Sequence, residues 1–240
     1  MERRRILITN DDGISSPGLF KLAKAASVFG DVTVVAPDGE RSGISHCFTY
    51  KNPIKGRKVD DYGLPGVEAY ALDGTPADCV RIGVLKIMDR KPDFVFAGIN
   101  AGYNIASDIQ YSGTIGAVME ASFQGIAATA FSKGGKKSDE LIDRYLEKLI
   151  EEQLNIPYVK GCARNINFPD CSLEECRGIL RDVKVSDDDF YRDEYSLEED
   201  GEGGLSFMVS QKRNWKGTEG TDLYAILNDY ISEGPVYNIR

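Results

Sequence analysis

The chain has 240 residues, of which 42% are hydrophobic and 28% are charged, values typical of a globular protein. This length predicts one α/β domain with an appendage. The formal net charge of -9 argues against a nucleic-acid polymer or an anionic membrane as partner, because both require a basic face.

No segment for export or membrane insertion is expected. The apolar run after the arginines at positions 3–5 stops after three residues and meets Asn10, so it lacks the apolar core of a signal peptide. No stretch approaches the ~20 apolar residues of a membrane-spanning helix. Five cysteines without a Cys-x-x-Cys pair predict reduced thiols, a cytoplasmic location and no zinc site.

Apolar runs alternate with helical patterns over the first two-thirds of the chain. Runs with the length and composition of strands cover residues 6–9, 32–36, 94–99, 127–132 and 163–169. Amphipathic or small-residue patterns predict helices at residues 17–29, 76–88, 115–124 and 140–153. This alternation predicts a doubly wound, mostly parallel α/β sheet.

The last part of the chain gives weaker signals. Residues 187–203 are strongly acidic, which predicts an exposed segment. Residues 205–210 and 224–231 are expected to form strands or an arm. We therefore divide the chain into an α/β core, residues 1–180, and a C-terminal extension, residues 181–240.

Oxygen-bearing side chains follow three of the predicted strands. Asp11 and Asp12 follow the first strand, Ser42 follows the second, and Asn100 follows the strand at 94–99. The carboxyl ends of parallel strands meet at one edge of the sheet, which is where such sheets bind ligands. Adjacent carboxylates repel each other, and carboxylate, hydroxyl and amide oxygens suit Mg²⁺ or Mn²⁺. The alternative is an Asp-Asp-Gly turn in which one aspartate caps the next helix.

A second feature is the start of the predicted helix at 115–124. Ser112, Gly113 and Thr114 lie at its N-terminus, where free backbone N–H groups and the positive end of the helix dipole favour a phosphate group. A helix cap without a ligand is the alternative reading of these residues.

Five sequence blocks between Ile8 and Ala121 resemble the SurE family, the survival protein E nucleotidases. The blocks read ITNDDGI, VVAPDGERSGISH, LDGTPADCV, GINAGYN and YSGTIGAVMEA. The resemblance implies a Rossmann-like core and a divalent-metal-dependent phosphatase acting on nucleoside 5′- and 3′-monophosphates, with one Mg²⁺ or Mn²⁺ per subunit. It also implies a C-terminal arm that joins subunits into a homodimer or homotetramer. The side chains expected to hold that arm on a partner are Trp215, Leu223, Tyr224 and Tyr230.

The resemblance assigns roles to particular residues. The family's metal ligands fall on Asp11, Asp12, Ser42 and Asn100, and its phosphate-side positions match Asn10, Gly43, His46, Asn104, Ser112, Gly113 and Thr114. Asp11, Asp12 and His46 are the catalytic candidates. The chain departs from the family pattern at Ser45, Cys47 and Tyr103, which concerns loop shape and substrate preference, and in its tail, which concerns assembly.

Other classes of protein share some of these features. A receiver-type signalling domain also pairs acids after its first strand, and Asp73 and Lys133 are its candidate phosphoacceptor and lysine. A nucleotide-binding domain without catalysis normally carries a glycine fingerprint that is absent after this first strand. A phosphatase of the haloacid-dehalogenase type uses carboxylates two residues apart, whereas Asp11 and Asp12 are adjacent. The attacking group stays open between water, with an aspartate as base, and an aspartate itself.

Overall fold

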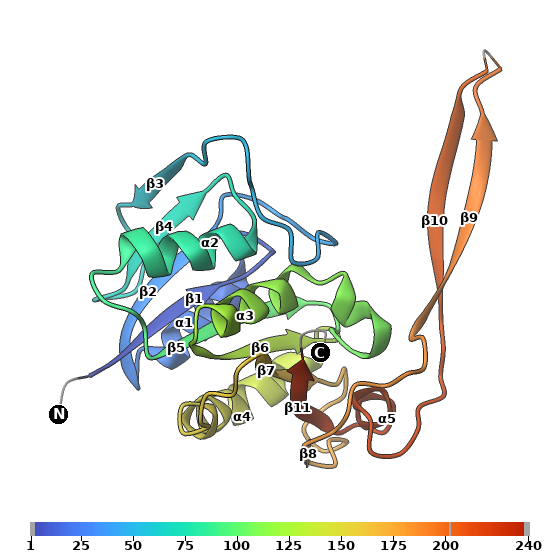
Figure 1. Cartoon of the computed structure of the whole chain (residues 1–240). Coiled ribbons are helices and arrows are strands. Elements are labelled where there is room, and N and C mark those ends of the chain that lie inside the picture. Colours follow the sequence, from blue (N-terminus) through green and yellow to red (C-terminus); the bar gives the residue numbers. More distant parts are fainter. Residues whose placement is uncertain (1–2, 202, 238–240) are drawn as a thin grey trace.

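The computed structural model describes residues 3–201 and 203–237. Its centre is a nine-stranded sheet in the order β3-β4-β2-β1-β5-β6-β7-β11-β8, and a two-stranded hairpin, β9-β10, projects away from it (Figure 1). The sheet strands are β1 (Arg4–Thr9), β2 (Gly30–Pro37), β3 (Gly56–Val59), β4 (Glu68–Leu72), β5 (Phe94–Ala101), β6 (Ala127–Lys133), β7 (Cys162–Phe168), β8 (Ile179–Arg181) and β11 (Ile231–Tyr237). The hairpin strands are β9 (Tyr191–Glu199) and β10 (Leu205–Arg213).

In the described part of the nine-stranded sheet, the neighbouring strands β4, β2, β1, β5, β6 and β7 pair in parallel, as do β11 and β8, and only β3-β4 and β7-β11 pair antiparallel. The β9-β10 hairpin is antiparallel as well and stands outside this sheet. The predicted doubly wound, mostly parallel sheet is therefore confirmed. Helices connect β1 to β2, β4 to β5, β5 to β6 and β6 to β7, whereas the connection from β2 to its parallel neighbour β4 passes through β3.

Five α-helices accompany the sheet in the described chain. They are α1 (Pro17–Ala26), α2 (Pro76–Ile82), α3 (Gly113–Phe123), α4 (Ser138–Gln153) and α5 (Asp222–Leu227). A π-helical turn, Gly83–Ile87, extends α2, and a 3₁₀ turn, Ala106–Gln110, precedes α3. Two of the α-helices begin with the caps that the sequence predicts. Thr75 and Asp78 form a reciprocal capping box at the start of α2, and Ser112 Oγ accepts a hydrogen bond from Ile115 N at the start of α3.

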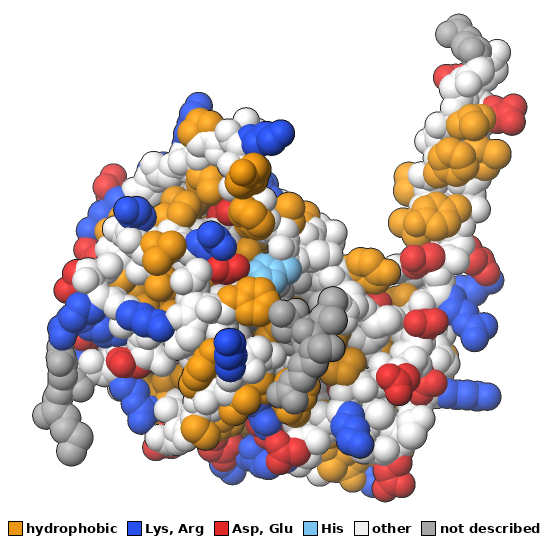
Figure 2. Space-filling model, in the orientation of Figure 1, with side chains coloured by type: hydrophobic (Ala, Val, Ile, Leu, Met, Phe, Trp, Pro, Cys, Tyr) orange, Lys and Arg blue, Asp and Glu red, His pale blue; other side chains and the backbone are white. Residues whose placement is uncertain are grey.

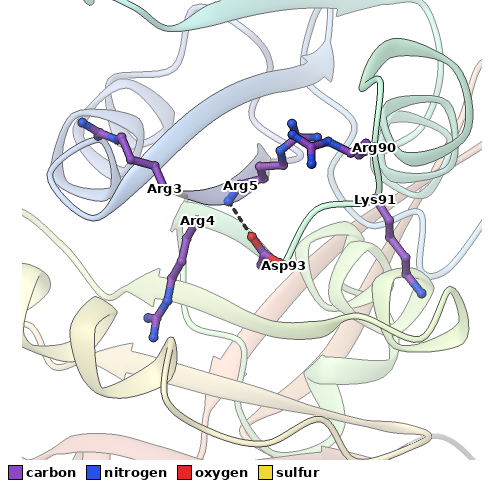
Figure 3. A pocket seen from close by; sticks show the side chains of 6 residues that line it. All are labelled: Arg3, Arg4, Arg5, Arg90, Lys91 and Asp93. Atoms are coloured by element: carbon purple, nitrogen blue, oxygen red, sulfur yellow. Dashed lines mark hydrogen bonds between the residues drawn. The ribbon is translucent and has the colours of Figure 1, made fainter. Parts of the chain in front are cut away.

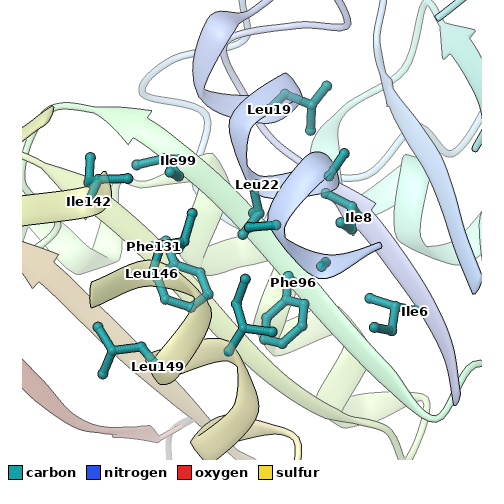
Figure 4. Close-up of a cluster of buried hydrophobic side chains, with 14 of the residues drawn as sticks. Ile6, Ile8, Leu19, Leu22, Phe96, Ile99, Phe131, Ile142, Leu146 and Leu149 are labelled. Carbon is teal, nitrogen blue, oxygen red and sulfur yellow. The ribbon is translucent and has the colours of Figure 1, made fainter. Parts of the chain in front are cut away.

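The two faces of the sheet bury separate apolar clusters. In β1, Ile6 and Ile8 face the cluster that holds α1 and α4, whereas Leu7 faces the cluster that holds α2 and α3. Figure 4 shows the first of these clusters, where Leu22 of α1 and Leu146 of α4 pack over Phe96 and its neighbours. Because side chains of a strand alternate between faces, continuous apolar runs are what a sheet covered on both sides requires.

The C-terminal part of the chain corrects one expectation. Residues 224–231 were expected to be strand or arm, but α5 covers residues 222–227 because Thr221 caps it and accepts a hydrogen bond from Tyr224 N at 3.2 Å. Leu223 and Ile226 of this helix pack on Ile105. Leu223 is fully buried in its own chain, so the expectation that it contacts a partner subunit is wrong.

After α5 the chain returns to the main sheet, where β11 pairs with β7 and β8. The division of the chain at residue 180 stays a prediction, and residues 231–237 belong to the core sheet. The predicted exposure of the acidic segment is confirmed over β9, where every residue except Tyr191 is exposed, whereas Phe190 just before it is buried.

Candidate active site

The candidate site begins in the loop between β1 and α1. Asn10 is buried and shapes this loop, since its Nδ2 donates to Gly13 O at 3.0 Å and its Oδ1 accepts from Gly13 N at 3.2 Å. Gly13 has φ +96°, a conformation that strains other residues, and it lies against Gly39. The side chain of Asn10 therefore presents the two aspartates that follow, rather than facing a ligand.

Asp11 is buried against the N-terminus of α3. Its Oδ1 accepts from the Thr114 hydroxyl at 2.5 Å, and its Oδ2 accepts from Thr114 N at 3.1 Å. Gly113 makes this approach possible, because a Cβ there would lie 3.0 Å from Asp11 Cβ. Ser112 Oγ accepts from Ile115 N and caps the helix. The helix N-terminus predicted to bind phosphate thus also holds a carboxylate.

Asp12 lies beside the carboxyl end of β5, the neighbour of β1. Its Oδ2 accepts from Ala101 N at 3.3 Å. The adjacent Asn100 donates from Nδ2 to Gly102 O at 2.9 Å, which leaves its Oδ1 available as a ligand. The structure therefore brings Asp11, Asp12 and Asn100 together, as the strand order requires.

The loop after β2 reaches the same place. Arg41 N donates to Asp11 O at 2.7 Å, and this bond brings the neighbouring Ser42 to the site. Ser42 is exposed and its hydroxyl donates to Glu40 Oε1 at 2.9 Å. Glu40 was not among the predicted site residues, although its negative charge acts on both Asp11 and Asp12.

The electrostatics of the site favour a bound cation. Burial raises the pKa of Asp11, against the hydrogen bonds from Thr114. Burial and then the charge of Asp11 raise the pKa of Asp12 to about 6. A divalent ion would oppose both effects, because a nearby positive charge favours ionised carboxylates. The donors present are carboxylate, amide and hydroxyl oxygens, which suit Mg²⁺ or Mn²⁺.

Neutral ligands are needed to complete such a site. Within residues 3–201 and 203–237, no three His, Cys, Asp or Glu side chains are placed to hold an ion together. Asp11 and Asp12 are two carboxylates, and oxygens of Asn100 and Ser42 would complete the predicted set of four ligands beside water. Ser42 would have to turn from Glu40 to join it.

Lys133 is a cation that the sequence reading placed only in the receiver alternative. It ends β6 in register with Ala101 of β5, and its positive charge acts on Asp12. Its ammonium also pairs with Asp139 at the start of α4, 2.6 Å away. Lys133 therefore places a positive charge beside the loop that carries Asp11 and Asp12.

His46 reaches along α3, away from Asp11. A Cβ at Gly116 would lie 2.9 Å from His46 Cα, so the loop packs directly on the helix. The imidazole Nε2 is 3.0 Å from Glu120 Oε2, and the ring stacks on Phe123 with centroids 5.3 Å apart. Glu120 is six residues along α3 from Thr114, which holds Asp11, so the imidazole contacts the helix nearly two turns from that aspartate and has a carboxylate partner of its own.

Glu120 is held by more than His46. Its side chain is only 5% exposed, and its Oε1 accepts from Arg81 at 3.2 Å and from Gln124 at 2.9 Å. Burial acts to raise its pKa, but the hydrogen bonds of His46 and Gln124 and the Arg81 charge outweigh burial and lower that pKa. Glu120 is therefore an ionised partner for the imidazole, and the sequence reading missed it.

Asn104 and Gly43, both matched to phosphate-side positions of the family, lie in different parts of the structure. Asn104 is buried; its Nδ2 donates to Ser132 Oγ at 2.8 Å and its backbone N–H to Asn167 Oδ1 at 2.8 Å. It anchors the loop after β5 to β6 and β7. Gly43 is exposed and lines an open hollow of about 940 Å³ between the Tyr111 loop and the base of the β9-β10 hairpin.

A basic hollow of about 360 Å³ lies at the opposite, amino-terminal edge of the sheet, lined by Arg3, Arg4, Arg5, Arg90, Lys91 and Asp93 (Figure 3). Its side chains point in different directions, and two of them already pair with carboxylates, Arg3 with Asp31 and Arg5 with Asp89. The hollow is therefore separate from the acidic site and offers no convergent set of donors.

The fold and the site define a doubly wound α/β protein with an acidic, oxygen-rich site at the carboxyl edge of its sheet. The family model described as Survival protein SurE matches residues 6–187. The chain belongs to the SurE family, and the resemblance stated from its sequence is confirmed.

Curated relatives agree with this assignment. The chain is 36% identical over 236 residues to a 5′-nucleotidase SurE of Aquifex aeolicus (strain VF5), covering 96% of this chain and 91% of that protein. It is 38% identical over 232 residues to a 5′/3′-nucleotidase SurE of Wigglesworthia glossinidia brevipalpis, covering 96% and 90%. The crystal structure of the SurE protein from Aquifex aeolicus superposes with a TM-score of 0.81 at 35% identity, covering 97% of this chain and 93% of that one.

Proposed function

We propose that this chain is a divalent-metal-dependent phosphomonoesterase that hydrolyses nucleoside 5′-monophosphates, and also 3′-monophosphates, to nucleoside and phosphate. The observation that carries the proposal is the packing of the Asp11-Asp12 pair between the N-terminus of α3 and the end of β5. The nucleotidase names of the relatives support it.

The ligands would be Asp11, Asp12, Ser42 and Asn100. When bound, Mg²⁺ or Mn²⁺ supplies positive charge to the phosphoryl oxygens and lowers the pKa of water. The fold supplies the rest: Thr114 fixes the carboxylate of Asp11, so that its remaining lone pairs face a constant direction.

The phosphoryl group would lie beside the start of α3. The backbone N–H groups of Ser112 and Gly113 and the helix dipole would meet the charge that develops there. Because Glu120 is held ionised, His46 Nε2 would donate its hydrogen to that carboxylate, and Nδ1 would exchange a proton with the substrate.

The nucleoside would occupy the open hollow beside Gly43. Tyr111, Tyr191 and Tyr195 line this hollow and offer aromatic faces to a base, while Asp108 offers a carboxylate to ribose hydroxyls. Because the chain is acidic, this hollow suits a single mononucleotide better than a nucleic-acid polymer.

A receiver-type role is disfavoured by the strand order. Asp73, its candidate phosphoacceptor, follows β4, which is separated from β1 by β2. The strand beside β1 on its other side is β5, which ends in Asn100 and Ala101. Along residues 3–201 and 203–237, no aspartate therefore ends the strand where a phosphoacceptor beside Asp11 and Asp12 would be needed.

We also propose that the chain acts as a cytoplasmic homodimer or homotetramer. The β9-β10 hairpin exposes large apolar side chains, among them Tyr195, Leu197, Phe207 and Met208, and Figure 2 shows them along the projecting arm. An isolated two-stranded hairpin is marginally stable, so a second copy of the chain is its natural support. Among the described residues no helix is long and apolar enough to cross a membrane.

The proposed activity is tested by phosphate release from a panel of nucleoside 5′- and 3′-monophosphates. The protein is first stripped with a chelator and then assayed alone and with added Mg²⁺, Mn²⁺ or Ca²⁺. We expect hydrolysis only after a divalent ion is added, and faster hydrolysis of mononucleotides than of a simple sugar phosphate. Equal turnover in the chelator would contradict the metal, and absence of turnover with every ion would contradict the activity.

A further inference from the structure

The loop between β7 and β8, residues 169–178, carries two of the five cysteines, five positions apart. Cys171 is 3% exposed and belongs to the apolar cluster on the α1 and α4 face of the sheet. Cys176 is half-buried and packs against that same cluster. One thiol is therefore sheltered and its neighbour is reached by solvent.

The backbone of this loop folds Cys176 back toward Cys171. Cys176 N donates to Ser172 O at 3.0 Å, which closes one turn. Glu175 and Ser172 cap each other, because Ser172 N donates to Glu175 Oε2 at 2.8 Å and Glu175 N donates to Ser172 Oγ at 3.3 Å. The turn is thus fixed by three hydrogen bonds over five residues, 172–176.

The turn places both cysteines on one apolar cluster, where Cys176 Sγ also lies 3.9 Å from Gly178 O. Burial raises the pKa of Cys171 to about 12, and the charge of Cys176 and a hydrogen bond between the two side chains raise it further in the same direction. A metal does not explain the pair, since no third His, Cys, Asp or Glu completes a ligand set within the described residues.

We propose that Cys171 and Cys176 are a modification site that closes to an intramolecular disulfide. The oxidant is a low-molecular-weight disulfide. The half-buried but solvent-accessible Cys176, as its thiolate, attacks one oxidant sulfur and releases one thiolate, and the Cys171 thiolate then displaces the second from the mixed disulfide. The protein loses two protons and two electrons, the electrons reduce the oxidant to two thiols, and one Cys171–Cys176 bond is formed.

The bond would fasten a junction of several elements. Asp170 N donates to the Tyr103 hydroxyl at 2.9 Å, and Asp170 Oδ1 accepts from Lys137 N at the start of α4. At the other end of the loop, Arg177 N donates to Asp229 O, between α5 and β11. Because the closed loop is short, the disulfide removes little entropy from the unfolded chain, and we expect a small rise in Tm.

Trypsin makes the test direct, because cleavage after Arg164 and Arg177 releases one peptide, residues 165–177, that holds both cysteines and no other. The folded full-length protein is equilibrated with mixtures of reduced and oxidised glutathione, quenched by acid, alkylated, digested and analysed by mass spectrometry. The same peptide, made synthetically, is equilibrated in parallel. Exposed Cys47 reports that the oxidant works, and buried Cys79 reports that the fold is intact.

We expect the peptide from the folded protein to be lighter by two hydrogens and to resist alkylation. Its equilibrium constant for disulfide formation should exceed that of the synthetic peptide by about tenfold or more, because the fold holds the thiols together. Cys171→Ser should leave Cys176 as a glutathione mixed disulfide, and Cys176→Ser should leave Cys171 alkylated only after unfolding. A mixed disulfide on Cys176 of the unmodified chain, or equal constants for protein and peptide, would overturn the proposal.

Discussion

Thr114 holds Asp11 through both carboxylate oxygens, from its hydroxyl to Oδ1 at 2.5 Å and from its backbone N–H to Oδ2 at 3.1 Å. The bond joins the end of β1 to the first turn of α3, two elements more than 100 residues apart in the chain. One carboxylate is therefore oriented by the same helix whose N-terminus is proposed to bind phosphate.

We expect Thr114→Val to lower kcat by about 10- to 100-fold, because a hydrogen bond to a charged group is worth about 1.5–3 kcal/mol. The substitution keeps the shape and the backbone N–H and removes only the hydroxyl. Thr129→Val is the matched control, since Thr129 is equally buried and bonds Gln153 instead. The measurement is steady-state release of phosphate with Mg²⁺ saturating, and equal losses in the two variants would contradict a specific role for Thr114.

His46→Ala should lower turnover by about 100-fold, the lower range for loss of a general acid or base, without weakening metal binding. The imidazole lies on Glu120 and stacks on Phe123, so it is not one of the proposed ligands. Metal binding is measured by calorimetric titration of the apoprotein with Mn²⁺. Gln124→Leu removes another hydrogen bond to Glu120 and should keep most activity. A His46→Ala protein that no longer binds Mn²⁺ would make the imidazole a ligand.

Asp108→Asn should stabilise the fold at neutral pH. Burial, and then the charges of Asp193 and Asp189, raise the pKa of Asp108 to about 6, and its Oδ2 is buried without a hydrogen-bond partner among the described residues. A raised carboxyl pKa means that the stability present below the unfolded value of 3.8 is lost as the pH rises through about 6. The free energy of unfolding of the variant should therefore exceed that of the unmodified protein at pH 7 and match it near pH 4.

Urea unfolding at several pH values gives this difference. Asp143→Asn serves as the control, because Asp143 is an exposed carboxylate paired with Lys21 and its substitution should have a small effect. A difference between Asp108→Asn and the unmodified protein that does not change between pH 4 and pH 7 would contradict the argument.

The β9-β10 hairpin should be required for assembly. Asn214 N donates to Phe190 O at 2.7 Å, so the two ends of the hairpin meet and residues 191–213 can be replaced by a short glycine linker. α5 and β11 follow the hairpin and pack in the core, so they are kept. Light scattering should give a dimer or tetramer for the full chain and a monomer for the deletion variant. A full chain that is monomeric at micromolar concentration would contradict the proposed assembly.

Much of the fold could be predicted from local patterns. The continuous buried run of β1 and the caps at Thr75 and Ser112 depend on residues close in sequence, and the structure has them as expected. Segment 224–231 was misread because an apolar run of this length suits a strand or a short helix. Thr221 with Leu223 and Ile226 gave the helical spacing that could have decided between them.

The candidate site was predictable only in part. Asp11 and Asp12 are adjacent in the chain, and strand order alone brings Asn100 beside them. The position of Lys133 depends on the register between β5 and β6, and the contact of Glu120 with His46 depends on the packing of a loop on α3. No short sequence motif contains either of these relationships. Asn104 matches a phosphate position of the family in the sequence, but in the structure its side chain anchors a loop.

The most direct test of the account is calorimetric titration of chelator-stripped protein with Mn²⁺, with phosphate release measured on the same samples. Asp11→Asn and Asp12→Asn each remove one negative charge from the proposed ligands, and Asp38→Asn removes one from an exposed carboxylate that pairs with Arg41 in the neighbouring loop. We predict one Mn²⁺ per chain for the unmodified protein and for Asp38→Asn, with hydrolysis that follows occupancy. Asp11→Asn and Asp12→Asn should lose most binding and most turnover while unfolding as cooperatively as the unmodified protein. Unchanged Mn²⁺ binding and wild-type turnover in both variants would contradict the assignment of the site.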